Sequence, residues 1–395
     1  MTNKKIVKPD LAIQKDVGTK ASDGTTLKNI WLELPGYCNL ACSYCYAEGG
    51  KPKNIGNLLS WADYVSILEQ AKAIGVEDIG IPGAGEPLLP KNQDLTFRVL
   101  EKCKDLGFYV TLFTTGEWID EKIADRLYDL PVEVMIKGNT LRPEVQDAFV
   151  SDPSRGRNIT GYGQRRNESL ELLMSKGFND EQKCKEKYGR KSRMALVTSI
   201  MTSSGEGPTN YDDMAELLRF ARENNIIFDV DSVLKRGRGA TCDLCEEDQR
   251  LKSKLQELQK IDREEYGNRW ELSQSYIGTV CDRFSYHMYI NQYGDIRPCI
   301  GAMDVNIGNA KETTLEQAWN SQEMQIIRSR NYKGKCGDEC ANFSEIDEER
   351  TAEAGTIKHK CNSCLGRRTE NLTNESLLEN GYVSTIGCWN HRPKE

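Results

Sequence analysis

The sequence predicts an α/β protein in which a partial, TIM-like (βα)6 barrel precedes a cysteine-rich C-terminal domain. Two observations predict this fold. From residue 28 to about 240, short β-branched runs alternate with segments of helical periodicity, which is typical of a parallel sheet with helical crossovers. From Cys281 onward the chain has little apolar periodicity and is rich in cysteine, glycine and charge. Such a segment is stabilised by bound metal ions or iron–sulfur clusters more readily than by an apolar core.

The predicted strands share a run of β-branched or aromatic residues that ends at glycine, proline or a polar residue. They lie at residues 28–36, 78–87, 108–116, 131–139, 193–203 and 226–237. Because parallel strands joined by crossovers place their carboxyl ends at one edge, we expect the catalytic loops there.

The predicted helices carry apolar residues at helical spacing, and the first of them has a Ser60 cap and ends at Gly75. They lie at residues 60–75, 95–107, 119–130, 168–178 and 211–225. Residues 142–164, rich in proline, glycine and charge, predict a long loop or a short helix over the barrel mouth. The expected domains are an N-terminal extension and three further parts. Their bounds are 1–27 for the extension, 28–240 for the barrel core, 241–280 for a charged helical bridge and 281–395 for the cysteine-rich domain.

Composition excludes several classes of function. The 395 residues suffice for two or three domains with real cores. Lys and Arg number 53 and Asp and Glu number 60, for a net charge of −7, which argues against binding nucleic acid by phosphate neutralisation. No apolar run approaches the roughly 18 residues that a membrane span needs, and the N-terminus lacks the apolar region of a signal peptide. We therefore expect a cytoplasmic protein that binds neither nucleic acid nor membrane.

The chain has 14 cysteines and 3 histidines. Because disulfides are rare in a reducing cytoplasm, metal or cluster ligation is the leading explanation. Three of the cysteines, Cys38, Cys42 and Cys45, fall within eight positions of the stretch GYCNLACSYCYAEGG. Thiolates on one tight loop can hold three irons of a [4Fe–4S] cluster, and the iron without a protein ligand stays open to a substrate. The alternative is a structural zinc or cluster that a distant cysteine completes.

The spacing C-x3-C-x-aromatic-C, with Tyr44 at the aromatic position, resembles that of the radical S-adenosylmethionine (radical SAM) superfamily. The resemblance extends over residues 28–240, because the motif opens the series of β–α units. It implies that the amino and carboxylate groups of SAM chelate the open iron. Electron transfer from the cluster then cleaves SAM to methionine and a 5′-deoxyadenosyl radical, which abstracts hydrogen from an unactivated carbon. It also implies an external electron donor such as flavodoxin or ferredoxin.

A second motif agrees with the resemblance. The sequence GAGEP at residues 83–87 ends the second predicted strand, where the family has a Gly-Gly-Glu motif that binds the methionine amine of SAM. Ala84 replaces the middle glycine. Glycines let backbone approach a ligand closely, and Glu86 could accept a hydrogen bond from the ammonium group. The structural alternative is a turn that carries a surface glutamate.

Further SAM contacts are expected from the ends of strands four to six. The resemblance implies a set of cofactor-binding residues: Tyr44, Gly83, Ala84, Gly85, Glu86, Asn139, Ser199 and Arg236, with Lys137 beside them. For the residues at strand ends, the alternative is that each is an ordinary loop residue.

The tail begins with Cys281, twelve residues, Gly294, four residues and Cys299, which resembles the start of the SPASM extension of radical SAM enzymes. The segment predicts a β-hairpin that turns at Tyr293–Gly294, followed by a helix over residues 314–321. SPASM domains typically bind two auxiliary [4Fe–4S] clusters. The ligands that the resemblance implies are Cys281, Cys299, Cys336, Cys340, Cys361, Cys364 and Cys388.

The tail departs from the usual SPASM pattern, since C-x3-C at residues 336–340 precedes C-x2-C at 361–364. Seven thiols also cannot fill eight ligand positions. Either one auxiliary iron is open, or Cys242 or Cys245 supplies the missing ligand. A zinc knuckle built from the same two pairs is the alternative.

Two hypotheses for the reaction follow. In the first, an auxiliary cluster accepts the second electron, and the outcome is oxidation or cross-linking of a ribosomal peptide, or dehydrogenation of a small polyol or aminosugar. In the second, a redox-neutral isomerase, epimerase or deaminase carries structural tail clusters. A non-enzymatic iron–sulfur scaffold leaves the GAGEP motif and the barrel unexplained.

Family frequency favours a peptide substrate, although only about 28 residues precede the first strand, too few for a leader-peptide-binding domain. A separate recognition protein or a small-molecule substrate would account for this. Ile300 stands where sulfatase-maturing members carry a carboxylate, which counts against that activity. The candidate proton acceptors are Asp282, Tyr289 and Asp295, and the alternative for each is a structural role.

Overall fold

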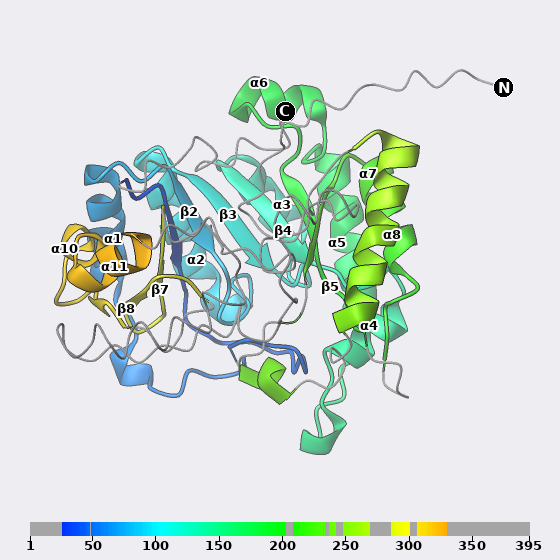
Figure 1. The fold of residues 1–395 in the computed structure, drawn as a ribbon, viewed down its shortest axis with the longest axis horizontal. Helices are drawn as coiled ribbons and strands as arrows, with labels where there is room; N and C mark the ends of the chain where they lie inside the picture. The colour runs from blue at the N-terminus through cyan, green and yellow to red at the C-terminus, as the bar shows by residue number, and fades with distance from the viewer. Residues whose placement is uncertain are drawn as a thin grey trace.

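The structure is a computed structural model that describes residues 26–47, 49–202, 208–231, 233, 237–241, 248–268, 286–300 and 306–329. In this part of the chain the strands form one sheet in the order β6-β5-β4-β3-β2-β1-β7-β8-β9 (Figure 1). The strands are β1 Asn29–Leu32, β2 Asp78–Ile81, β3 Tyr109–Thr114, β4 Val132–Lys137, β5 Met194–Ser199, β6 Ile227–Asp231, β7 His287–Ile290, β8 Asp295–Arg297 and β9 Gly308–Asn309.

Strands β1 to β6 pair in sequence order, and every pair among them is parallel. Their registers place the carboxyl ends, and the loops that follow them, at one edge of the sheet. The apolar strand residues are mostly buried on both faces, as the crossover helices require. The predicted fold class, a parallel sheet of β–α units, is confirmed.

Helices cover the sheet (Figure 1). They are η1 Ile55–Asn57, α1 Trp61–Ala73, α2 Pro90–Asp105, α3 Glu121–Tyr128, α4 Pro143–Phe149, η2 Pro153–Arg155, α5 Tyr162–Lys176, α6 Glu181–Tyr188, α7 Met214–Glu223, η3 Gly237–Thr241, α8 Asp248–Tyr266, α10 Leu315–Trp319 and α11 Gln322–Ser329. The predicted cap of α1 forms a reciprocal capping box between Ser60 and Asp63. Pro90 opens α2, where its fixed φ suits a first helical turn.

Three helices differ from the predicted pattern. Helix α5 begins at Tyr162, six residues before the predicted start, and α2 begins five residues early. Helix α6 was not predicted, because its sequence EQKCKEKY has no apolar stripe. The segment 142–164, predicted as a loop or a short helix, contains α4 and η2. The charged bridge contains α8, which packs against α7.

The cysteine-rich tail begins by extending the barrel sheet. Strand β7 pairs in parallel with β1, with Asn29 opposite His287, and β8 and β9 continue antiparallel. The turn between β7 and β8 uses Gly294 at φ 93°, so the predicted hairpin is confirmed. The predicted helix is α10, which Thr314 caps and which packs beside α1. The hairpin therefore lies directly beside the strand that leads into the three-cysteine loop.

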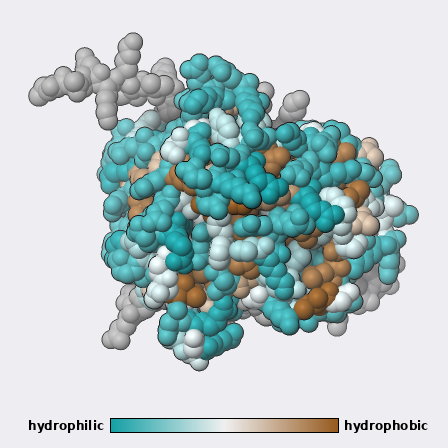
Figure 2. Space-filling view, turned by 180° about the vertical axis from the view of Figure 1, so that it is seen from behind, coloured by the Kyte–Doolittle hydropathy of each residue, from teal (hydrophilic) through white to brown (hydrophobic). Residues whose placement is uncertain are grey.

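The outer surface carries no large apolar patch among the described residues. Ile55 is the exposed large apolar side chain there, with 47% of its surface exposed. Figure 2 shows one face of the molecule, which is largely hydrophilic with separate hydrophobic spots. No helix of the described chain is both long enough and apolar enough to cross a membrane.

Candidate active site

The three-cysteine loop follows β1 and is folded by its own backbone. The Cys38 N–H donates to the Gly50 carbonyl at 3.0 Å, and the Cys45 N–H donates to the Cys42 carbonyl at 3.3 Å. The Leu40 N–H points at the Cys38 sulfur, 3.4 Å away. Burial, and then the charge of the neighbouring Cys45 thiol, raises the pKa of Cys42 to about 11. Coordination to iron overrides such a shift, because a metal deprotonates its thiol ligand outright.

The segment that contains α4 and η2 lies against this loop. The Ala41 N–H donates to the Val150 carbonyl at 2.8 Å, and Arg157 donates to the Asn39 carbonyl at 2.6 Å. Leu40 packs with Val150 in a small buried cluster that Cys38 and Cys42 also contact. The segment thus holds the cysteine loop at the carboxyl edge of the sheet.

The GAGEP loop after β2 also packs against the cysteine loop. Gly83 has φ 71°, a left-handed conformation that favours glycine. A Cβ on Gly85 would overlap the backbone of Gly36 and Tyr37, so only glycine allows this approach. Ala84 is buried and has no positive φ, which explains how alanine fits the middle position. In the described chain, no hydrogen bond occupies the backbone groups of residues 83–85.

Glu86 is fully buried, and its carboxylate accepts hydrogen bonds from the chain itself. The donors are the Leu88 N–H at 2.8 Å, the Thr114 hydroxyl at 2.6 Å and the Thr115 N–H at 2.6 Å. Burial raises the pKa of Glu86, and these hydrogen bonds oppose the rise. The carboxylate therefore joins the ends of β2 and β3, and its contact with the SAM ammonium stays a prediction.

Side chains at the ends of β4 and β5 meet the aromatic residue of the cysteine loop. The Lys137 ammonium donates to the Ser199 hydroxyl at 2.8 Å and lies 5.2 Å from the Tyr44 ring centroid. The Asn139 carboxamide oxygen accepts from the Ser199 N–H at 3.0 Å. The structure thus brings Tyr44 of the cysteine loop together with three residues that the sequence placed at the ends of the fourth and fifth strands.

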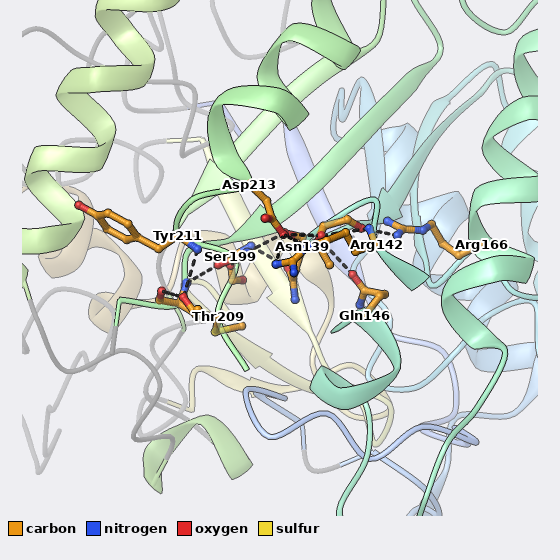
Figure 3. Close-up of polar contacts among 11 residues, drawn as sticks. Asn139, Arg142, Gln146, Arg166, Ser199, Thr209, Tyr211 and Asp213 are labelled. Carbon is orange, nitrogen blue, oxygen red and sulfur yellow. Dashed lines mark hydrogen bonds and ion pairs between the residues drawn. The ribbon is translucent and has the colours of Figure 1, made fainter. Parts of the chain in front are cut away.

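Asn139 is held by contacts on several sides (Figure 3). Its N–H donates to the Gln146 side-chain oxygen at 2.9 Å, and its carbonyl accepts from Asn210 at 2.8 Å. Close to it, Arg142 forms an ion pair with Asp213 at 2.9 Å. The position of Asn139 is therefore fixed by the residues that follow β4 and β5.

The Tyr44 hydroxyl and the Asn139 amide nitrogen are buried and make no hydrogen bond of good geometry among the described residues, although the Asn139 and Cys42 side chains lie close enough to the hydroxyl to shift its pKa. Burial and the nearby Cys42 thiol raise the pKa of Tyr44. A buried unpaired polar atom is costly, about 1–3 kcal/mol. Beside a three-thiol loop, such a pair fits a polar ligand such as SAM, and the thiols fit an iron–sulfur cluster.

Sequence reasoning missed Arg238. Arg236, the expected contact, lies outside the described residues, whereas Arg238 lies beside the cysteine loop. A Cβ on Gly49 would be 2.9 Å from its guanidinium, and its charge lowers the pKa of Cys42 against the effect of burial. Both arginines belong to the run KRGRG after β6, and the run gives no signal that tells them apart.

Two of the three candidate proton acceptors of the tail, Tyr289 and Asp295, lie within the hairpin. Tyr289 is fully buried and its hydroxyl donates to Glu33. Asp295 accepts from Asn291 at 2.9 Å and pairs with Arg297 at 3.4 Å. Their role as proton acceptors stays a prediction.

Cys299 follows β8 and is buried. The remaining predicted site residues lie outside the described residues: Cys242, Cys245, Cys281, Asp282, Cys336, Cys340, Cys361, Cys364 and Cys388. Within the stretches that the structure describes, no three Cys, His, Asp or Glu side chains are gathered as tightly as a bound metal would hold them. Ligation is therefore argued from the motif and its surroundings.

The class of protein follows from comparison with known families. Residues 32–185 match the model of the radical SAM superfamily, and residues 281–342 match the SPASM iron–sulfur cluster-binding domain. The chain carries a radical SAM domain followed by a SPASM domain, and both resemblances expected from the sequence are confirmed. These domains imply SAM and [4Fe–4S] clusters as cofactors.

Particular relatives cover different parts of the chain. A probable GTP 3′,8-cyclase of Methanococcus maripaludis strain C6 is 34% identical over 121 residues, which are 30% of this chain and 39% of that protein. The chain thus spans about two-fifths of the length of this relative. The sporulation killing factor maturation protein SkfB of Bacillus subtilis is 24% identical over 321 residues, which are 77% of this chain and 68% of SkfB.

Solved structures share the fold. Streptococcus suis SuiB bound to S-adenosylmethionine aligns with a TM-score of 0.58 at 20% identity, covering 80% of this chain and 70% of SuiB. Native anSMEcpe with bound AdoMet aligns with a TM-score of 0.55 at 14% identity, covering 79% of this chain and 85% of anSMEcpe. At such identities the likeness establishes the fold alone.

Proposed function

We propose that this chain is a cytoplasmic radical SAM oxidoreductase that modifies a ribosomal peptide. One observation carries the proposal: the three-cysteine loop, the GAGEP loop and the cluster of Tyr44, Asn139 and Ser199 converge at the carboxyl edge of the sheet. When bound, the cluster and SAM supply a 5′-deoxyadenosyl radical that abstracts hydrogen from an unactivated carbon.

The residues of the chain have separate tasks in this proposal. Cys38, Cys42 and Cys45 hold the cluster. The backbone of residues 83–85 binds the methionine amine, because no described residue forms a hydrogen bond with these groups while the Glu86 carboxylate is engaged. The Tyr44 hydroxyl and the Asn139 amide bind polar groups of SAM, which would satisfy both atoms. The segment around α4 and η2 holds the cysteine loop in place through Val150 and Arg157.

A peptide substrate is supported by two relatives. SkfB is named as a maturation protein of the sporulation killing factor, and SuiB has been solved bound to the precursor peptide SuiA. Auxiliary clusters in the tail would accept the second electron, which makes the outcome oxidative, and flavodoxin or ferredoxin would supply the first. The second candidate is a redox-neutral reaction, favoured by the seven tail thiols, which cannot complete two clusters.

The test is anaerobic reconstitution followed by iron analysis and SAM cleavage with dithionite. Wild-type protein should bind more than four irons and release 5′-deoxyadenosine, and Cys42→Ala should abolish the release. Cys103→Ala is the matched control, because Cys103 is a buried thiol inside α2. A wild-type protein that cleaves no SAM would overturn the proposal. If a small polyol, and no peptide, stimulates cleavage, the peptide substrate is wrong.

A further inference from the structure

A buried carboxyl group lies between the cysteine loop and the tail hairpin. Glu33 directly follows β1, and 3% of its surface is exposed. Its N–H donates to the Ile290 carbonyl at 2.9 Å, and its carbonyl accepts from the Tyr64 hydroxyl at 3.0 Å. Burying a carboxyl group is costly unless hydrogen bonds compensate for the lost water. The hydrogen-bond donors to the Glu33 carboxyl group therefore indicate its structural role.

The partners come from both sides of the interface. One carboxyl oxygen accepts from the Tyr46 hydroxyl at 3.1 Å and from the Tyr289 hydroxyl, and the other accepts from the Gln292 N–H at 3.1 Å. Tyr46 directly follows Cys45 in the loop, whereas Tyr289 and Gln292 belong to the hairpin. Because all three groups can donate, a group that accepts at both oxygens suits the site. One side chain thus joins segments that are about 245 residues apart in the sequence.

Gln292 makes two further contacts, one of them with the residue that opens the cysteine-loop segment. The Gly36 N–H donates to the Gln292 side-chain oxygen at 2.8 Å, and the Leu59 N–H donates to the Gln292 carbonyl at 2.9 Å. The hairpin then continues through β8 to Cys299, which is buried. The backbone that carries one predicted cluster ligand is therefore tied to the loop that carries three others.

We propose that Glu33 is a positioning residue: hydrogen-bonded to Tyr46 and Tyr289, it holds the cysteine loop against the hairpin that leads to Cys299. The inference rests on the proposed function in one respect, that Cys299 ligates an auxiliary cluster. None of these bonds involves the residues assigned to SAM. A site that depends on the placement of redox groups needs supporting residues that fix its geometry to about 0.5 Å. Glu33 provides this support from inside the molecule.

Three single hydroxyl deletions separate positioning from general packing. Tyr46→Phe and Tyr289→Phe each remove one bond to the Glu33 carboxyl group and leave the ring in place. Tyr64→Phe is the control, because it removes a buried hydroxyl that binds the backbone carbonyl of the same Glu33. All three are reconstituted as holoenzyme and compared with wild type by iron content and thermal unfolding.

Amide hydrogen exchange of residues 36–47 is the first measurement. Losing a bond to the buried carboxyl group should speed exchange in the loop about tenfold in Tyr46→Phe and Tyr289→Phe. Tyr64→Phe should leave it near the wild-type rate. Equal rates in all three variants, whether raised or unchanged, would overturn the inference.

Microwave-power saturation of the reduced loop cluster is the second measurement, because it depends on the distance to another paramagnetic cluster. Tyr289→Phe should change the half-saturation power relative to Tyr64→Phe, and an unchanged value contradicts a role in spacing the clusters. If wild type binds only four irons, the proposed function of the tail fails, whereas the exchange data still decide the role of Glu33. Glu33→Gln should exchange faster than wild type, since an amide cannot accept from the tyrosines and the Gln292 N–H together.

Discussion

At the scale of single residues, Tyr44 and Glu86 show how far a motif specifies a site. Both residues were identified from the sequence, but their hydrogen-bond partners could not be predicted from it. The Tyr44 hydroxyl lacks a partner of good geometry in the described chain, whereas the Glu86 carboxylate accepts hydrogen bonds from Leu88, Thr114 and Thr115. A sequence motif gives the residue type at a position, but the partners depend on which loops the fold brings near. Arg238 was missed for the same reason.

Tyr44→Phe should weaken SAM binding without loss of iron. The variant keeps the ring that lies beside Lys137 and removes the hydroxyl, which makes no hydrogen bond of good geometry in the described chain. A lost hydrogen bond of about 1 kcal/mol corresponds to roughly a fivefold higher dissociation constant. Titration of SAM into the oxidised, reconstituted protein measures this. Tyr188→Phe, which loses a hydroxyl bonded to the distant Leu130 carbonyl, should bind SAM like wild type.

Glu86→Gln should lower the stability of the barrel edge. The amide places a donor where the carboxylate now accepts, so the Thr114 hydroxyl or the Thr115 N–H faces it unpaired. One unsatisfied buried group costs about 1–3 kcal/mol in the free energy of unfolding. Denaturant unfolding of the cluster-free protein measures this cost. If Glu86→Gln leaves the stability unchanged and weakens SAM binding, the Glu86 carboxylate instead binds SAM.

At the scale of elements, the long periodic segments were predictable and the charged ones were not. Strands β1 to β6 follow their β-branched runs closely. Helix α6 has Asp180 as its N-cap and Gly189 at its C-terminal end, and both residue types are typical of helix termini. Its sequence nevertheless lacks the apolar periodicity by which the other helices were predicted. Helix α5 begins earlier than predicted because the residues after Tyr162, GQRRNE, are glycine or polar and hide the apolar periodicity of its first turns.

Gly85→Ala should disturb the packing between the GAGEP loop and the cysteine loop. The added Cβ would overlap the Gly36 and Tyr37 backbone, which cannot move aside as a flexible side chain would. Overpacking of this kind costs about 1–3 kcal/mol, and we expect iron incorporation below half of the wild-type value. Ala84→Gly at the neighbouring position should incorporate iron normally. Equal iron in both variants would mean that the loops do not need this close contact.

At the scale of the whole molecule, the described start of the tail forms part of the barrel sheet. The sequence predicted the hairpin but not its place, because periodicity reports local structure and carries no information on which distant strand a hairpin joins. Pairing of β7 with β1 covers an edge that would otherwise expose free backbone groups.

Shortened chains test this covering role. A chain that ends at residue 268 lacks β7 to β9 and should associate through the open edge of β1. A chain that ends at residue 329 keeps these strands with α10 and α11 and should remain monodisperse. Size-exclusion chromatography with light scattering distinguishes the two. A monodisperse chain ending at residue 268 would show that β1 needs no cover.

The pairing of Asn29 with His287 also means that β1 is synthesised long before its partner strand β7. Synthesis proceeds at about 5–20 residues per second, so the first strand waits roughly 13–50 seconds for a neighbour 258 residues downstream. During that interval the three thiols that follow the strand have emerged, while the hairpin that ties down their loop has not. Newly made chains would therefore be open to cluster-delivery proteins at the stage when their thiols are also most exposed to oxygen.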